Sequence, residues 1–197
     1  MGCEYANKIR EAEQGLEHKC PYCREAVPKS DEDMDKNYME RAKANDPEAL
    51  NQLGKKRQVE GDYEGAFEYW TKAAALGDVV AQYQLSVMYD EGDGVDKDIN
   101  KQLYHLEEAA IGGHPSARYN LGIYENAHGR DDRAVKHFII AAKLGYDDAL
   151  EAIKTYFASG FVSKEDFEAA LLEHQAAVDA TKSAKREEAY AVFNSNT

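Results

Sequence analysis

One block of residues recurs three times in this chain and begins a fourth time, and this repetition constrains the fold more than any other feature. Each copy contains a pair of alanines followed by a glycine, and these glycines, 36 and 32 residues apart, are Gly77, Gly113 and Gly145. A leucine followed by glycine or serine runs in phase with that marker, at Leu53, Leu85 and Leu121. Self-similarity at such a period is typical of solenoids, in which each unit buries its apolar face against the next. The repetition therefore predicts a stack of similar units and favours a binding protein over an enzyme.

Each unit is predicted to be a helix, a turn and a second helix. In the first unit, Asp46 is a good N-cap and Pro47 is a good first helical residue. Gly61 interrupts the pattern, apolar residues then recur at helical spacing around Trp70, and Gly77 ends the run. Because neither helix can bury its apolar face alone, neighbouring units are expected to complete the core.

Small residues mark the places where the helices are expected to cross closely. The small residues at these predicted crossings are Gly54, Gly122, Ala73, Ala109 and Ala141. The large residues predicted to fill the space beside them are Leu53, Trp70, Leu85, Leu106, Leu121 and Phe138. A branched side chain at Gly122 is therefore expected to overpack the stack.

The second unit carries four extra residues between Glu91 and Asp98, and with them the most specific motif of the chain. The pattern Ala-x-x-x-Leu-Gly, a tyrosine, Gly-x-Gly-Val-x-Lys-Asp and Ala-Ala-x-x-Gly resembles Sel1-like repeats, a branch of the tetratricopeptide-like α-solenoids. Ser86 and Gln102 depart from that pattern. The resemblance covers roughly residues 46–177. It implies an all-α fold, a right-handed α-solenoid of antiparallel helix pairs with a long C-terminal capping helix.

The repeats are predicted to span residues 46–162, as units 46–77, 78–113 and 114–145 followed by a half repeat at 146–162. Residues 163–197 are predicted to be a capping helix and tail, beginning at a capping box formed by Ser163 and Asp166. The residues of this helix expected to face the stack are Phe167, Leu171, Leu172 and Val178. Residues 30–45 are predicted to be an acidic connector that packs on the first unit as an N-cap.

The cysteines all lie before residue 24, within a separate segment at residues 1–29. Cys20 and Cys23 form the tetrapeptide Cys-Pro-Tyr-Cys, which is also that of glutaredoxins. That redox chemistry requires a strand before the pair and a long helix after it, and Pro28 argues against such a helix. Two further interpretations remain: a zinc half-site, since two thiolates at this spacing reach one tetrahedral ion, or reduced cysteines in an unstructured tail.

The segment from Cys3 to Pro28 also resembles the last third of a RING-type zinc finger, where Cys-x-x-Cys-Arg ends the domain and an earlier cysteine precedes a helix. The resemblance implies that Cys3, Cys20 and Cys23 are the sixth, seventh and eighth zinc ligands. The first five would lie before Met1 in a longer natural form. Zinc is accordingly the one cofactor that the sequence suggests.

Composition narrows the partners that the chain is expected to bind. The formal net charge is −13, which argues against nucleic acid and anionic membranes because phosphate recognition requires clustered Lys and Arg. No apolar stretch is long enough for a transmembrane helix, and the N-terminus has no apolar core of a secretory signal. With cysteines that look unpaired, these features predict an intracellular, cytoplasmic protein whose partners are other proteins or peptides.

Five of the six histidines lie in the repeats or the cap, on separate predicted helices and without the i+3 or i+4 partners of a metal or catalytic motif. His114, just before Pro115, is predicted to cap a helix. The sequence contains no nucleophile elbow, zinc-protease motif or phosphate-binding loop, so no catalytic residue and no small-molecule substrate are predicted.

In tetratricopeptide-like stacks the first helix of each unit lines the concave face, which the resemblance makes the candidate binding groove. The predicted groove residues are Asn51, Lys55, Tyr83, Val87, Tyr119 and Ile123, edged by Asp90 and Asn126. Aromatic residues are common binding hot spots, and Tyr83 and Tyr119 could equally serve to pack adjacent units.

Two functions follow from these patterns. The first is a non-catalytic scaffold or adaptor that holds a peptide or helix of a partner in the concave groove. The second, implied by the RING resemblance, is the substrate-binding part of a RING-type ubiquitin-protein ligase in a longer natural form.

Overall fold

A computed structural model of the chain describes residues 31–181. Residues Tyr38 to Val178 form one compact unit, and the described residues outside it are the outer ends of the first and last helices. The cysteine segment and the end of the predicted C-terminal helix lie outside the described residues. Every regular element between residues 31 and 181 is a helix. None of these helices is long and apolar enough to cross a membrane.

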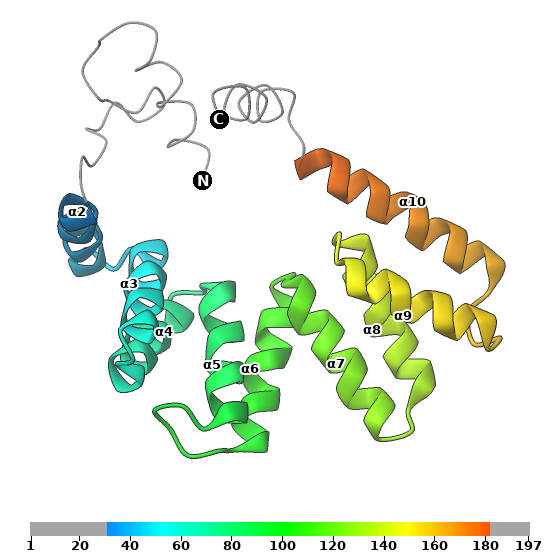
Figure 1. Cartoon of the computed structure of the whole chain (residues 1–197), viewed down its shortest axis with the longest axis horizontal. Coiled ribbons are helices and arrows are strands. Elements are labelled where there is room, and N and C mark those ends of the chain that lie inside the picture. The colour runs from blue at the N-terminus through cyan, green and yellow to red at the C-terminus, as the bar shows by residue number, and fades with distance from the viewer. Residues whose placement is uncertain (1–30, 182–197) are drawn as a thin grey trace, which may run out of the picture. The chain divides into compact units, whose positions relative to one another are not determined.

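The helices follow one another as antiparallel pairs, which confirms the predicted α-solenoid (Figure 1). Their bounds are α2 Asp31–Lys43, α3 Pro47–Val59, α4 Tyr63–Ala75, α5 Val79–Glu91, α6 Ile99–Ile111, α7 Pro115–Ala127, α8 Asp131–Lys143, α9 Asp147–Ala158 and α10 Lys164–Thr181. The pairs α3–α4, α5–α6 and α7–α8 pack most extensively, and each second helix then contacts the first helix of the next pair.

Side-chain caps fix where the first helices of the units begin. The Asp46 carboxylate accepts from the backbone N–H groups of Glu48 and Ala49, and Asp78 caps α5 in the same way. At the start of α7 the imidazole Nδ1 of His114 accepts from the backbone N–H of Ala117 at 3.3 Å, as predicted. These bonds satisfy donors that a helix start otherwise leaves unpaired.

The end of α2 has the geometry of the second helices of the repeats. The glycines after α4, α6 and α8 have φ of 87°, 88° and 85°, and Asn45 takes the same left-handed conformation after α2, with φ 58°. The Asp46 N–H donates to the carbonyl of Arg41 at 3.1 Å, as the Asp78 N–H donates to that of Ala73 at 3.0 Å. The acidic connector thus leads into the stack as a helix in register with the repeats.

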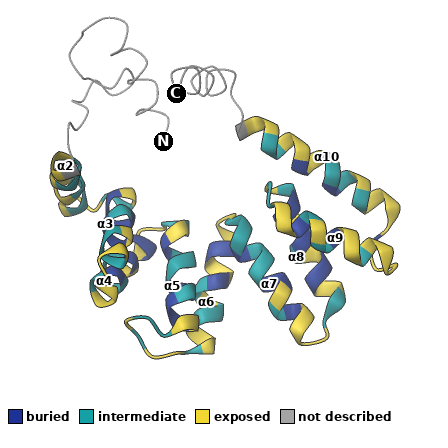
Figure 2. Cartoon of the chain, in the orientation of Figure 1, coloured by how far each residue is buried: buried dark blue, intermediate teal, exposed yellow. Residues whose placement is uncertain are grey.

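The predicted close crossings exist, and the glycines at two of them face aromatic rings. A β-carbon at Gly54 would lie 2.6 Å from the Trp70 indole, and one at Gly122 would lie 2.5 Å from the Phe138 ring. In the second unit, buried Ser86 takes the glycine position and buried Leu106 takes the aromatic position. The predicted large core residues are all buried where the helices face one another (Figure 2).

The extra residues of the second unit form a loop that closes over the first. Gly92 ends α5 in the left-handed conformation, with φ 79°. Gly94 has φ 70° and lies against the backbone of Tyr63, where a β-carbon would come within 2.8 Å. Val95 then packs against the core that the first unit shares with α5. The Gly-x-Gly-Val motif is therefore explained by a close backbone approach followed by an apolar anchor.

One half of the predicted capping box opens α10, because the Asp166 N–H donates to the Ser163 hydroxyl at 3.0 Å, and that hydroxyl donates in turn to Oδ2 of Asp166 at 2.8 Å. The prediction for the buried face of α10 is only partly right. Leu172 is 73% exposed, whereas Ala170 and His174 are buried. Leu172 lies outside the packed stripe because the residues that meet the α8–α9 core recur as 170, 174 and 177.

The spacing of small and large residues in α10 matches that of the earlier second helices. The series Ala66, Trp70, Ala73 of α4 and Ala134, Phe138, Ala141 of α8 recurs as Ala170, His174, Ala177. Phe157 of α9 stacks on Phe167 of α10, with ring centroids 4.6 Å apart. The α9–α10 pair thus has the residue spacing of a repeat unit, with a histidine at the aromatic position, but its two helices pack far less extensively than those of the three repeat units.

Candidate interaction surface

The predicted groove residues lie on the first helices α3, α5 and α7, with different degrees of exposure. Lys55, Asp90, Ile123 and Asn126 are exposed, Tyr83, Val87 and Tyr119 are half-buried, and Asn51 is buried. The exposed members therefore offer the side chains that a partner can reach directly, and the half-buried ones lie between helices.

The expectation that Asn51 is exposed is wrong. Its side chain is 7% exposed, and its Oδ1 accepts a hydrogen bond of 3.0 Å from the indole Nε1 of Trp70. The reason is that Trp70 is fully buried and its N–H requires an acceptor inside the core. Asn51 thus satisfies the tryptophan of its own unit.

Tyr83 joins the second unit to the third. Its ring stacks on the imidazole of His114, with centroids 4.3 Å apart and planes 14° apart. Its hydroxyl accepts from Nδ2 of Asn120 at the long distance of 3.5 Å. These contacts join α5 to the beginning of α7 and give Tyr83 a packing role.

Tyr119 packs in a similar way one unit further on. Its ring lies 5.4 Å from that of Phe138 and 5.1 Å from that of Tyr146, measured between centroids. Val87 and Ile123 occupy equivalent positions, two residues after the marker leucines, and Ile123 is 47% exposed. Ile123 is therefore the large apolar side chain of the predicted set that is most open to a partner.

Asn126 belongs to a polar network between the third and fourth helix pairs. Its Nδ2 donates to the hydroxyl of Tyr156, which donates in turn to Oδ1 of Asp131 at 3.0 Å. Burial raises the pKa of the Tyr156 phenol, the bond from Asn126 opposes that shift, and Asp131 adds to it. The phenol therefore stays protonated and ties α7, α8 and α9 together.

A buried ion cluster was not predicted from the sequence. Glu125 of α7 is buried, and its carboxylate binds Nε of Arg130 and lies 3.0 Å from Nη2 of Arg133. Burial favours the neutral acid, but the bond from Arg130 and the charges of both arginines outweigh it and lower the pKa of Glu125. No repeat marker signalled this cluster, because the equivalent residues in the other units are Arg57, Tyr89 and Phe157.

The pKa values of three half-buried histidines are shifted in the same direction. Burial lowers the pKa values of His105, His114 and His137. Nδ1 of His137 is buried without a hydrogen-bond partner, and Nε2 of His174 lies 2.9 Å from Asp147 without the angle of a hydrogen bond. Among residues 31–181, no group of three or more His, Cys, Asp and Glu side chains is placed to hold a metal ion.

The fold is a stack of antiparallel helix pairs, with small residues at the crossings and a surface formed by the first helices. These features define a tetratricopeptide-like helical-repeat protein. The Sel1 repeat profile matches residues 47–78, 79–114 and 115–146, about half of the chain. The chain belongs to the Sel1 repeat family.

Curated relatives share the repeats but are much longer. Chitin synthase regulatory factor 4 of Schizosaccharomyces pombe is 28% identical over 86 residues, 43% of this chain and 14% of the relative. A putative sel1-like repeat-containing protein of Acanthamoeba polyphaga mimivirus is 35% identical over 69 residues, 35% of this chain and 13% of the relative. Chitin synthase regulator SKT5 of Saccharomyces cerevisiae is 39% identical over 59 residues, 30% of this chain and 8% of the relative.

Solved structures agree with the fold. A Sel1 repeat protein from Oxalobacter formigenes aligns with a TM-score of 0.60 at 28% identity, covering 75% of this chain and 63% of that one. A protective antigen of uropathogenic Escherichia coli that displays an SLR fold aligns with a TM-score of 0.59 at 27% identity, covering 87% and 37% of the two chains.

Proposed function

We propose that this chain is a protein-interaction scaffold that binds a peptide or helix of a partner protein across the surface of its first helices. The observation that carries the proposal is Ile123, a large apolar side chain that is 47% exposed on the first helix α7, with half-buried Val87 at the equivalent position of α5. Stacked repeats form extended concave surfaces that proteins of this kind use for binding.

Two relatives support a regulatory role over a catalytic one. Both are named as regulators of chitin synthase. The chain spans less than a sixth of those relatives, so its own partner is a separate question. By this analogy the scaffold acts by burying apolar surface against its partner, and Lys55 and Asp90 supply charges at the edge of the contact.

The test is affinity capture from a cell extract with the chain and with an Ile123→Asp variant. We expect the variant to lose its specific partners, because a carboxylate at the centre of an apolar contact must be desolvated without a partner. The matched control is Ile111→Asp, since Ile111 is an exposed isoleucine of the second helix α6.

Capture that is unchanged by Ile123→Asp, or lost equally with Ile111→Asp, would contradict the proposed surface. Both variants should first show the circular dichroism and melting temperature of the parent chain. Tyr83 and Tyr119 are less suitable targets, because replacing them would also remove contacts between units.

The ligase alternative rests on the cysteine segment alone. In that proposal Cys3, Cys20 and Cys23 contribute to zinc binding, and the repeats hold the substrate. It is tested by measuring zinc in the purified chain by mass spectrometry, beside a Cys20→Ser/Cys23→Ser variant. Zinc that disappears with the two cysteines supports a site in this segment, and zinc near zero in the parent chain refutes a local site.

A further inference from the structure

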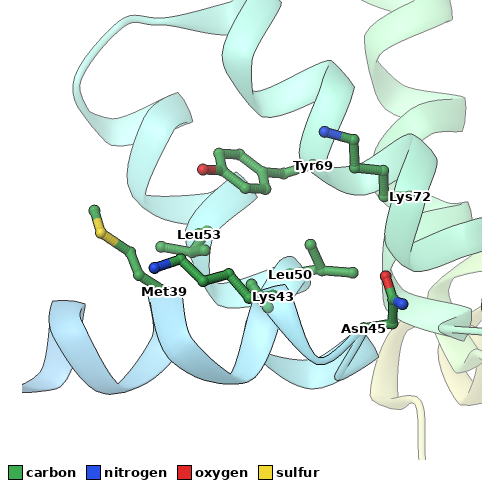
Figure 3. Close-up of a pocket in the computed structure, with 8 residues that line it drawn as sticks. Met39, Lys43, Asn45, Leu50, Leu53, Tyr69 and Lys72 are labelled. Atoms are coloured by element: carbon green, nitrogen blue, oxygen red, sulfur yellow. The ribbon is translucent and has the colours of Figure 1, made fainter.

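A groove lies between the end of α2 and α4, and α3 forms its floor. Its volume is about 460 Å³, within the range of clefts that bind ligands. Figure 3 shows Met39 and Lys43 entering from α2, Tyr69 and Lys72 from α4, and Leu50 and Leu53 between them. The groove therefore combines an apolar floor with a cation on each flanking helix.

The same junction is built differently in the next two units. Leu50 and Tyr69 of the groove correspond by repeat register to Gln82 and His105 in the second unit. There, His105 Nδ1 lies 2.7 Å from Gln82 Oε1, so two polar side chains bond to each other across the junction. In the third unit the equivalent pair is Arg118 and His137. An apolar pair at this junction is thus a property of the first unit.

The two groove lysines are available for a ligand. Neither Lys43 nor Lys72 is within ion-pair distance of a carboxylate in the described part of the chain, where most other cations of the first unit are paired. Lys72 Nζ lies 5.7 Å from the centre of the Tyr69 ring, at the edge of the apolar floor. Two unpaired cations beside apolar side chains are notable in a chain of net charge −13.

We propose that this groove docks an acidic segment of a partner protein that carries a large apolar side chain. The apolar side chain packs on Leu50, Leu53 and Tyr69, and carboxylates on either side of it approach Lys43 and Lys72. Apolar burial supplies affinity, and the two cations select against basic partners. The site is separate from the surface of the proposed function, because its walls are α2 and α4 and its α3 residues, Leu50 and Leu53, are not among the residues of that surface.

The probe is a phage-displayed library of random peptides, selected on the full chain. We expect enriched peptides to contain Asp or Glu flanking Leu, Ile, Phe or Trp. A synthetic, fluorescein-labelled copy of the most enriched peptide is then titrated by fluorescence anisotropy. Lys43→Glu/Lys72→Glu should weaken its binding at least about tenfold, and added salt should weaken binding to the parent chain.

Two controls separate the groove from bulk charge. Lys97→Glu/Lys136→Glu makes the same charge change at exposed positions outside both the groove and the first-helix surface, and should bind as the parent does. A peptide with Lys in place of each acid should bind the Lys43→Glu/Lys72→Glu variant better than it binds the parent chain. The proposal would be overturned if the enriched peptides lacked acidic residues, if no peptide were enriched, or if both lysine double variants lost peptide binding equally. Ile123→Asp should leave this binding unchanged, so the two surfaces fail or succeed separately.

Discussion

The indole of Trp70 lies directly against the backbone of Gly54, so closely that a β-carbon at that glycine would be 2.6 Å from Nε1. Phe138 and Gly122 repeat this relationship two units later, with the corresponding distance at 2.5 Å. Where the ring is replaced by Leu106, Ser86 replaces the glycine. Ring size on the second helix and side-chain size on the first therefore change together, which keeps the two helices equally close.

Gly122→Leu should lower the free energy of unfolding by about 1–3 kcal/mol, because the new side chain must displace the buried Phe138 ring. Gly122→Ala is a further test, because the sign of its effect on the free energy of unfolding depends on how closely the helices cross. At an open helical position that change stabilises by about 0.5–1 kcal/mol, whereas here it should destabilise. Urea unfolding measures both effects. Ala127→Leu, at the exposed end of the same helix, should be nearly neutral, and a stabilised Gly122→Ala would show that the crossing is looser than described.

Asn51→Ala should cost about 1–3 kcal/mol of stability, because it leaves the buried Trp70 N–H without an acceptor. In a Trp70→Phe background the same substitution should cost less, since no N–H remains to be satisfied. A double-mutant cycle of denaturant midpoints gives the coupling between the two residues. Additive effects would mean that the hydrogen bond contributes nothing.

Acidification should destabilise the chain through three half-buried histidines. Burial lowers the pKa values of His105, His114 and His137 below the usual 6.5. Just below that value the unfolded chain binds more protons than the folded chain, so the free energy of unfolding falls as pH decreases. The contribution of these neutral histidines to stability is fully present above pH 6.5, and it is lost as the pH falls towards their lowered pKa values. The melting temperature should therefore fall between about pH 7.5 and about pH 5.5.

His114→Asn isolates one of these groups. Asparagine is a strong N-cap that does not titrate, so the start of α7 should keep its cap while the pH slope becomes shallower. His114→Ala should instead lower the melting temperature at about pH 7.5 and at about pH 5.5 alike, because the backbone N–H of Ala117 loses its acceptor. An unchanged slope for His114→Asn would assign the pH dependence to other groups.

The buried Glu125 should respond asymmetrically to the loss of either side of its ion cluster. Glu125→Gln removes the charge and leaves two partly exposed arginines, which water can solvate. Arg130→Gln/Arg133→Gln leaves a buried carboxylate without a cation and should destabilise more. At lower pH that carboxylate takes up a proton, so the double variant should recover part of its stability. Urea midpoints at two pH values test this, and equal losses would contradict it.

Much of the fold could be predicted because its determinants are local or periodic. Asp46, Asp78 and His114 cap helices through bonds to backbone groups a few residues away, and the glycines after the second helices supply the left-handed conformation. The pairing of Gly122 with the next helix was also predictable, since a residue without a side chain within an apolar pattern indicates a close crossing.

The candidate surface was less predictable, because exposure depends on which neighbour covers a position. Asn51, Tyr83 and Tyr119 share one register position, yet Asn51 is buried while the two tyrosines are half-buried. The difference arises from Trp70, which reaches across its unit for an acceptor, and from His114, which offers a flat ring to Tyr83. Leu172 is exposed because the packed stripe of α10 runs through His174.

The sequence alone thus determined the repeat, the helix pairs and their crossings, since each follows from spacing and backbone chemistry within a few turns. Only the tertiary structure decided which polar residues the core absorbs, where Glu125 meets its arginines and where a groove with Lys43 and Lys72 lies beside an apolar floor. Those features depend on the distances between side chains of different helices, which are fixed when neighbouring units pack.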